Sequence, residues 1–187
     1  YGGTSRKIRN YLQISNKLYV INSSKNNNQI GYFKTELIKP VSPNYFNDKY
    51  KTTALTSLCS LLNSLLPEFQ PNVSIYKSFE KFIDILKLDN WIIPYIYFEI
   101  NLIKELGYDA DLNSFGTNQN ESSETKKIKI DDYTYDVPVY LINKKIPNNI
   151  TNVLIKKSLF FTRNVMLNKF FIPNNLALPK SRIIFEN

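Results

Sequence analysis

The sequence predicts an α+β fold in which a β-rich segment over residues 1–43 precedes a mainly α-helical domain over residues 44–187. Before residue 41, β-branched and aromatic residues gather in short runs that are typical of strands. From about residue 50, leucines recur at the spacing of one helix face. Pro40 and Pro43 separate the two patterns, and we place the domain boundary there.

The β-rich segment contains two β-prone runs, 18–21 and 29–37, on either side of the polar run 22–28. The polar run is made of Asn, Ser and Lys, and both Asn and Ser favour turns because their side chains bond to nearby backbone groups. We therefore expect a β-hairpin in this segment.

The helical domain begins with a leucine-rich helix that Thr52 or Thr53 can cap and that Pro67 ends. A second helix is expected to start near Ser74. A third runs from about residue 90 to Gly107, a C-capping glycine, and its apolar residues surround it. We expect this third helix to be the buried one at the centre of the domain.

The remainder of the domain is predicted to continue with a polar loop at about 113–127 and a weakly alternating stretch over 128–142. The alternation indicates a small hairpin or an extended arm. A long helix then reaches about Phe171, with Asn148 or Asn149 as its cap.

The positive charge is concentrated at the two ends of the chain. The whole sequence carries 24 Lys and Arg and 16 Asp and Glu, for a net charge of +8. The regions 1–41 and 148–187 carry excesses of +6 and +5, whereas 42–115 carries −3 and 116–147 is neutral. Basic clusters of this kind favour binding to nucleic-acid phosphates. The alternative is a lysine-rich surface that only keeps the protein in solution.

Cysteine and histidine usage excludes several kinds of chemistry. The one cysteine, Cys59, rules out a disulfide within the chain, and the absence of histidine rules out mechanisms with a histidine base. The most apolar stretch, 91–100, is too short to span a membrane. The chain starts at Tyr1 with no Met, basic leader or apolar signal core, as a fragment would. We expect a cytoplasmic protein without cofactor or metal.

The candidate nucleic-acid residues lie in and before the predicted hairpin. Arg6, Lys7 and Arg9 stand close to Tyr11, and sites for single strands combine cations on phosphates with rings stacked on bases. The hairpin adds two lysines to this set, Lys17 and Lys34. The alternative is an exposed hairpin whose charges are simply solvated.

Other polar residues give weaker indications, and we expect no catalytic residue. Asp109 and Asp111 could bind a metal, but a polar turn after a helix explains them better, and 131–132 is also expected to be a turn. Glu99 could be an acid with a raised pKa, but we expect it at the periphery of the third helix, exposed or paired with a base. Cys59 is expected to be a packed thiol.

Three segments resemble the bacterial RecO family of recombination mediators. They are Gly2-Gly3-Thr-Ser-Arg-Lys leading into Leu12-Gln13, the block 98–112 with Phe-Glu and Leu-Gly-Tyr, and Phe161-Thr-Arg followed by Leu178-Pro-Lys-Ser-Arg. The resemblance implies an OB-type β-domain followed by a helical domain. It implies binding to single- and double-stranded DNA, annealing of complementary strands, and loading of RecA onto strands coated by single-stranded-DNA-binding protein.

The resemblance also implies two direct partners, RecR and the acidic, apolar C-terminal tail of the coating protein. Relatives often carry arginines where Ile96 and Tyr97 stand here, so other cations must hold the tail or DNA. We list these as candidates: Lys104, Lys156, Lys157, Arg163, Lys180 and Arg182. The barrel is expected to be incomplete, because the family has further strands before the first residue of this chain. Residues 113–117 stand where some members carry a four-cysteine zinc module, so no zinc is expected.

Two other classes of function stay open on the sequence alone. One is a protein–protein adaptor whose basic ends have no direct role with DNA, and salt-dependent DNA binding separates it from a mediator. The other is a metal-dependent nuclease, which a chelator would inhibit. The mediator needs no covalent step, since a cationic surface lowers the repulsion between two strands.

Overall fold

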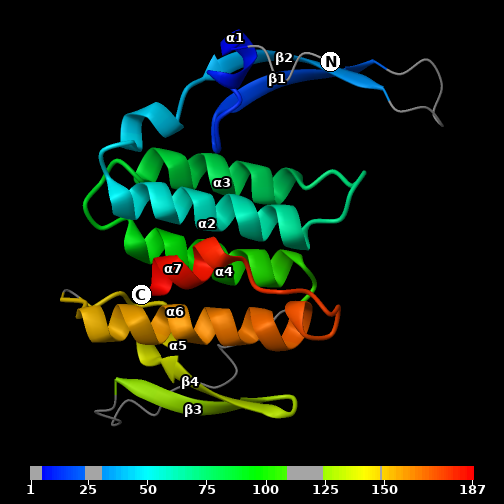
Figure 1. The fold of residues 1–187 in the computed structure, drawn as a ribbon. Helices are drawn as coiled ribbons and strands as arrows, with labels where there is room; N and C mark the ends of the chain where they lie inside the picture. Colours follow the sequence, from blue (N-terminus) through cyan, green and yellow to red (C-terminus); the bar gives the residue numbers. More distant parts are fainter. Residues whose placement is uncertain (1–5, 24–30, 109–123, 148) are drawn as a thin grey trace. The chain divides into compact units, whose positions relative to one another are not determined.

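The computed structural model describes residues 6–23, 31–108, 124–147 and 149–187. It is an α+β structure, with two separate two-stranded antiparallel sheets and several helices (Figure 1). Contacts divide the chain into two compact units, of which the first comprises Tyr1–Leu62 with Lys180–Phe185 and the second Asn63–Pro179 with Glu186–Asn187. The domain boundary that we expect after residue 43 stays a prediction.

The first unit contains the predicted β-hairpin and most of two helices. The strands β1 (Lys17–Ser23) and β2 (Tyr32–Lys39) pair antiparallel, as the sequence predicts. The other elements of this unit are α1 (Arg6–Arg9), the 3-10 helix η1 (Ser42–Tyr45), α2 (Lys49–Leu65) and α7 (Lys180–Glu186). The described residues place only two strands in this sheet, so an OB-type barrel remains an expectation.

The cap of α2 differs from the predicted one. The Asp48 carboxylate accepts a hydrogen bond from the backbone N–H of Lys51 at 3.0 Å, which is the interaction of an N-cap. Thr52 and Thr53 lie inside the helix, where their hydroxyls donate to backbone carbonyls of earlier residues. The prediction was wrong by about one turn because the leucine pattern starts one turn after the helix does.

The second unit is a stack of helices with a hairpin on one side. Helix α3 contacts α4, α4 contacts α6, and α6 contacts strand β4; Figure 1 shows α6 between α4 and the hairpin. The bounds of these elements are α3 Val73–Ile85, α4 Ile92–Glu105, β3 Thr125–Ile130, β4 Tyr133–Pro138, α5 Val139–Asn143 and α6 Asn152–Met166, followed by the π-helical turn η3 Leu167–Phe171.

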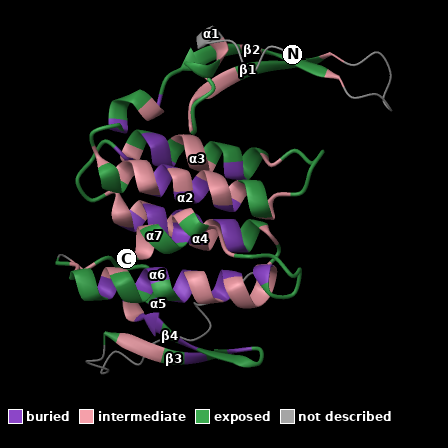
Figure 2. Cartoon of the chain, viewed as in Figure 1, coloured by how far each residue is buried: buried purple, intermediate pink, exposed green. Residues whose placement is uncertain are grey.

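Helix α4 has seven buried residues, and only its last two residues, Lys104 and Glu105, are exposed, as expected for the predicted central helix (Figure 2). Rings from α3 and α4 pack edge to face, with centroids 6.0 Å apart for Phe82 and Tyr95 and 5.9 Å apart for Phe79 and Phe98. The expectation that Glu99 is peripheral is wrong. Its side chain is fully buried where α4 packs on α6, and the Thr162 hydroxyl of α6 donates to its Oε2 at 2.5 Å.

The predicted C-capping glycine is confirmed at the end of α4. Gly107 has φ +88°, a left-handed conformation that costs an L-residue energy and glycine little. Its N–H donates to the Lys104 carbonyl, and the N–H of Tyr108 donates to the Ile103 carbonyl. This is a Schellman motif, and it fixes the direction in which Tyr108 leaves the helix.

The small hairpin, one of the two predictions for 128–142, is confirmed by β3 and β4, whereas the end of this stretch is helical. Strand β4 ends at Pro138 and helix α5 follows at once, so the alternation over 128–142 combines a hairpin with a short helix. Helix α6 is capped by Thr151, whose hydroxyl accepts from the N–H of Leu154 at 3.2 Å. Asn149 is therefore not the cap, and Asn148 lies outside the described residues.

Candidate nucleic-acid interface

The first hairpin presents two chemically different faces. Residues paired across an antiparallel sheet point to the same side, and the register pairs Ile21 with Lys34 and Ser23 with Tyr32. Tyr19 lies on this same side because side chains alternate along β1. Tyr19 is 54% exposed and Tyr32 is 60% exposed. The exposed carboxylate of Glu36 lies on this side too, because it pairs with Tyr19. We call this side the tyrosine face, and its members are Tyr19, Ile21, Tyr32, Lys34 and Glu36.

The tyrosine face combines flat rings with a cation. The Lys34 ammonium lies 6.0 Å from the centre of the Tyr32 ring, at the outer limit of a cation–π contact. Tyr32 and Tyr19 are exposed, and Lys34 is exposed beside them. Lys17, which was also predicted, is half-buried and pairs with Lys39 at the open end of the hairpin, away from its turn. Sequence reasoning missed both tyrosines, although their alternation with Lys34 was a usable signal.

The opposite face of the hairpin is apolar. The register pairs Leu18 with Leu37, Val20 with Thr35, and Asn22 with Phe33. This face carries no charged side chain, and Phe33 is 67% exposed. Both faces of the hairpin are therefore open to solvent in the described part of the chain, which leaves its broad surfaces available for ligands or partners.

Tyr11 does not have the predicted role of a free stacking ring. Its hydroxyl donates to the backbone carbonyl of Thr35 at 3.0 Å and lies 3.2 Å from the Thr35 hydroxyl. The ring is half-buried, so Tyr11 fastens the segment before β1 onto β2. Arg9 is exposed, whereas the side chains of Arg6 and Lys7 lie outside the described residues.

The second set of predicted cations is spread over three helices, and one of its members is buried. Lys104 is exposed at the end of α4, and Lys156 and Lys157 are exposed on α6. Lys180 is exposed at the start of α7. Arg182 is fully buried, so its guanidinium does not belong to an exposed binding set. The reason is the period of the short helix α7, which turns Arg182 inward.

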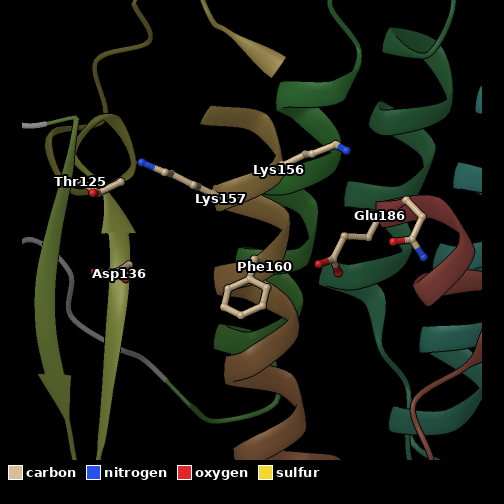
Figure 3. A pocket seen from close by; sticks show the side chains of 7 residues that line it. Thr125, Asp136, Lys156, Lys157, Phe160 and Glu186 are labelled. Atoms are coloured by element: carbon tan, nitrogen blue, oxygen red, sulfur yellow. The ribbon is translucent and has the colours of Figure 1, made fainter. Parts of the chain in front are cut away.

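A groove of about 370 Å³ lies along α6, with the second hairpin on one side and the end of the chain on the other (Figure 3). It is lined by residues of both elements and of the chain end, namely Thr125, Asp136, Lys156, Lys157, Phe160, Glu186 and Asn187. Figure 3 shows Lys157 reaching toward Thr125 and Lys156 reaching to the other side. The Arg163 guanidinium lies 4.6 Å from the Phe160 ring centre, and its Nη1 pairs with Glu186 at 3.2 Å. We call this the α6 groove.

A second cavity of about 400 Å³ lies where α4 and α6 begin. Its lining is almost wholly apolar and consists of Asn90, Ile92, Ile93, Pro94, Ile146, Pro147, Ile150 and Ile155. Neither helix has an acidic residue in its first turn, so the partial positive charge of both N-termini is uncompensated there. Two exposed lysines, Lys144 and Lys145, directly precede Ile146. We call this the isoleucine pocket.

An ion pair that the sequence did not indicate fixes the turn of the second hairpin. Asp131 sits in this turn with φ +51°, and its carboxylate accepts from the Lys169 ammonium and from the Tyr108 hydroxyl. The ammonium also lies 4.6 Å from the Tyr108 ring centre and 5.8 Å from that of Tyr133. The bond from Lys169 lowers the pKa of Asp131 and raises that of Lys169. We call this arrangement the lysine clasp.

Residues considered for catalysis take structural positions or fall outside the description. Asp109 and Asp111 lie outside the described residues, and Asp131 belongs to the lysine clasp. Burial raises the pKa of the Cys59 thiol, which keeps it protonated and unreactive at neutral pH. No cluster of three or more possible metal ligands occurs among the described residues. None of the described helices is long and apolar enough to cross a membrane.

Comparisons with known proteins place part of this chain in one family. Residues 47–131 match the family model described as Recombination protein O C terminal. A protein named DNA repair protein RecO from Wolbachia sp. subsp. Drosophila simulans is 37% identical over 103 residues, which are 54% of this chain and 43% of the relative. One of the same name from Ehrlichia chaffeensis is 33% identical over 123 residues, 65% of this chain and 50% of the relative.

A further relative with that name, from Rhodospirillum centenum, is 27% identical over 114 residues, covering 61% of this chain and 46% of its own length. The chain therefore spans about half the length of the curated relatives it matches. No solved structure was found to match it. Residues 47–131 of this chain are therefore similar to the RecO family of DNA repair proteins.

Proposed function

We propose that this protein binds single-stranded DNA in recombinational repair and works as a mediator. It anneals complementary strands and helps to load RecA onto strands coated by single-stranded-DNA-binding protein. The observation that carries the proposal is the tyrosine face, where Tyr19 and Tyr32 are exposed beside Lys34. The name DNA repair protein RecO, shared by its relatives, supports the same role.

The chemistry of the tyrosine face suits an unpaired strand. Bases of any sequence stack on tyrosine rings, while lysines neutralise the phosphates between them. In and before the first hairpin, Arg9 and Lys34 are exposed, and we assign them to phosphates. We expect Arg6 and Lys7 to bind phosphates as well. Holding strands on such a cationic surface lowers their mutual repulsion, so annealing needs no covalent step. Duplex DNA binds through the same phosphate contacts.

The test is a titration of single-stranded DNA at two salt concentrations. Affinity should fall with salt, with a log–log slope of about −0.7 for each phosphate neutralised. Tyr19→Ala with Tyr32→Ala should weaken binding by about 1–3 kcal/mol for each base that loses its ring. Tyr50→Ala with Tyr76→Ala removes two other exposed tyrosines and should leave binding unchanged.

The same titration separates the alternatives. An adaptor with no role on DNA would show no salt-dependent binding, and that result would sink the proposal. A nuclease would shorten the probe during the titration, and a chelator would stop the cleavage. We expect an intact probe with and without chelator.

A second candidate function is the capture of an acidic peptide with an apolar anchor. The isoleucine pocket favours it, because an apolar cavity is surrounded by two helix N-termini and by Lys144 and Lys145. The C-terminal tail of the coating protein has this chemistry and is the partner we propose, with RecR as a further partner whose surface we do not assign. This location replaces the predicted one around Arg182, which is buried.

The peptide proposal is tested with a labelled acidic peptide that ends in an aromatic residue. Reversing charge at Lys144 and Lys145 to Glu should abolish peptide binding and leave single-strand binding largely intact. Reversal at Lys77 and Lys81, two exposed lysines of α3, is the matched control. Loss of peptide binding in both variants would show general charge attraction instead of a pocket.

A further inference from the structure

We propose that the α6 groove is a second strand-binding site, which takes one unpaired nucleotide with its base on Phe160 and its phosphates at Lys156 and Lys157. The inference rests on the proposed function and deepens it, because it gives the second unit its own contact with DNA. A protein that anneals two strands needs two places to hold them. The groove belongs wholly to the second unit, whereas the tyrosine face belongs to the first.

The aromatic ring of Phe160 lines the groove and is not packed into the core. Phe160 is 49% exposed in the middle of α6, whose inward positions Leu159 and Phe161 are buried. The Arg163 guanidinium lies on the Phe160 ring and holds it in place. A ring fixed in this way offers a flat apolar surface to a base at little entropic cost, as in other single-strand sites.

The walls of the groove carry the groups that a nucleotide needs. Two adjacent lysines, Lys156 and Lys157, reach to opposite sides of α6 and can neutralise successive phosphates (Figure 3). Asp136 lies on the side of Lys157 and Glu186 on the side of Lys156, and their carboxylates can accept hydrogen bonds from base N–H groups, including the N3–H of thymine. The volume of about 370 Å³ lies in the usual range of small-ligand sites.

The same walls argue against an acidic peptide as the occupant. Arg163 is already paired with Glu186, so it adds little free charge to the groove. The Asp136 carboxylate offsets part of the charge of the two lysines, and a peptide with several carboxylates would face Asp136 and Glu186 directly. A nucleotide brings fewer charges together with a base that can stack and donate. The charge balance of the groove therefore favours nucleic acid.

The experiment uses the full chain with Tyr19→Ala and Tyr32→Ala, so that the remaining binding reports the groove. In this background Phe160→Leu keeps an apolar side chain and removes the ring, and should weaken binding of an oligothymidine by about tenfold. Lys156→Ala with Lys157→Ala should have a similar effect. Val153→Ala, an exposed site on the same helix, and Lys77→Ala with Lys81→Ala are the matched controls and should bind like the background.

Two further probes separate stacking from charge. On an abasic strand the defect of Phe160→Leu should disappear, because there is no base to stack, while the lysine variant should remain defective. An oligonucleotide with iodinated uracil should crosslink to Phe160 under ultraviolet light, since this photochemistry favours rings in contact with the base. Circular dichroism of each variant checks that the half-exposed side chains can be changed without unfolding.

Three results would overturn this inference, and one of them would also overturn the proposed function. If the groove variants bind like their controls and no crosslink maps to α6, the groove is not a strand site, although wild-type binding would keep the proposed function. If wild type itself fails to bind single strands, both proposals fall together. If an acidic peptide competes for the groove and oligothymidine does not, the groove is a peptide site and the inference is wrong.

Discussion

The two hairpins of this protein have the same secondary structure and opposite surroundings. Both are two-stranded and antiparallel, with residues paired in a regular register along most of their length. In β3–β4 one face is buried against α6, so that Ile128 is 2% exposed and Val137 is fully buried. In β1–β2 neither face is covered in the described residues, and Ile21 is 44% exposed.

The difference in burial determines which hairpin can stabilise the fold and which has side chains free to contact a ligand. A hairpin with a covered face contributes apolar burial to the core, which stabilises the fold by about 25 cal/mol for each Å² removed from water. A hairpin with two open faces contributes much less, so its side chains can be exchanged at low cost. We therefore expect the second hairpin to contribute more to stability than the first, and we propose that the first can devote more of its surface to ligand contacts.

The largest contrast is expected between two phenylalanines near the hairpins. Phe161 is buried and meets the Tyr135 ring of β4 edge to face at 5.9 Å, whereas Phe33 is exposed on β2. Phe161→Ala should lower the free energy of unfolding by about 3–5 kcal/mol, because it leaves a cavity. Phe33→Ala should change it by about 0.5 kcal/mol or less. Denaturant titration measures both, and equal losses would mean that β1–β2 is packed in solution.

A pair of isoleucines inside the strands makes the same comparison with identical chemistry. Ile128→Ala in β3 removes a buried side chain and should cost about 2–5 kcal/mol. Ile21→Ala in β1 removes an exposed one and should have little effect on stability. Because Ile21 belongs to the tyrosine face, single-strand binding can weaken in this variant while its melting curve stays unchanged. A large loss of stability in Ile21→Ala would remove the distinction between the hairpins.

The sequence predicts the two kinds of hairpin unequally. Alternation reveals strands in both, but the uncovered state of β1–β2 depends on what surrounds it, which a local pattern does not contain. The buried helix α4 could be predicted because apolar residues surround it, yet the same observation should have predicted that Glu99 is buried. Arg182 and Tyr11 look like surface groups by residue type, and only their places in the fold give them structural roles.

The candidate sites show the same limit. Counting charges along the sequence reveals the two basic ends of the chain. Four cations in these ends, Arg9, Lys34, Lys156 and Lys157, are exposed in the structure. The α6 groove and the isoleucine pocket could not, because each combines segments more than twenty residues apart in sequence. The lysine clasp was missed for the same reason, since Lys169 lies far along the chain from Tyr108 and Asp131.

A smaller effect is expected at the glycine that directs Tyr108 toward the second hairpin. Gly107→Ala should cost about 1–2 kcal/mol, because φ is positive there and an L-residue is strained in that conformation. No atom lies within 4 Å of the position an added Cβ would take, so steric clash adds nothing. A thermal melt measures the loss. Replacement by Asn, which tolerates this conformation better than Ala, should recover part of it, and an Asn variant as unstable as Ala would point to another cause.

The smallest effect is expected at the lysine clasp, which holds the turn of the packed hairpin and has no counterpart among the described contacts of β1–β2. Asp131→Asn keeps a side chain that tolerates positive φ and removes the charge that binds Lys169. Asp131 is well exposed, so water and salt screen the pair and global stability should barely change. Local opening of the turn should increase, and amide hydrogen exchange of residues near 130–133 measures it.

The pH dependence of this exchange identifies the charge pair. The pKa of Asp131 is lowered from 3.8 by its bond to Lys169, so the clasp is fully formed above pH 3.8 and is lost as pH falls through the lowered value. The pKa of Lys169 is raised from 10.5, so the clasp persists up to that pH and weakens as pH rises through the raised value. Asp131→Asn should remove both limbs of this profile, whereas Asp132→Asn, one residue further on, should keep them. If both variants behave alike, the turn of β3–β4 is held by its burial on α6 alone, and charge plays no part in distinguishing the two hairpins.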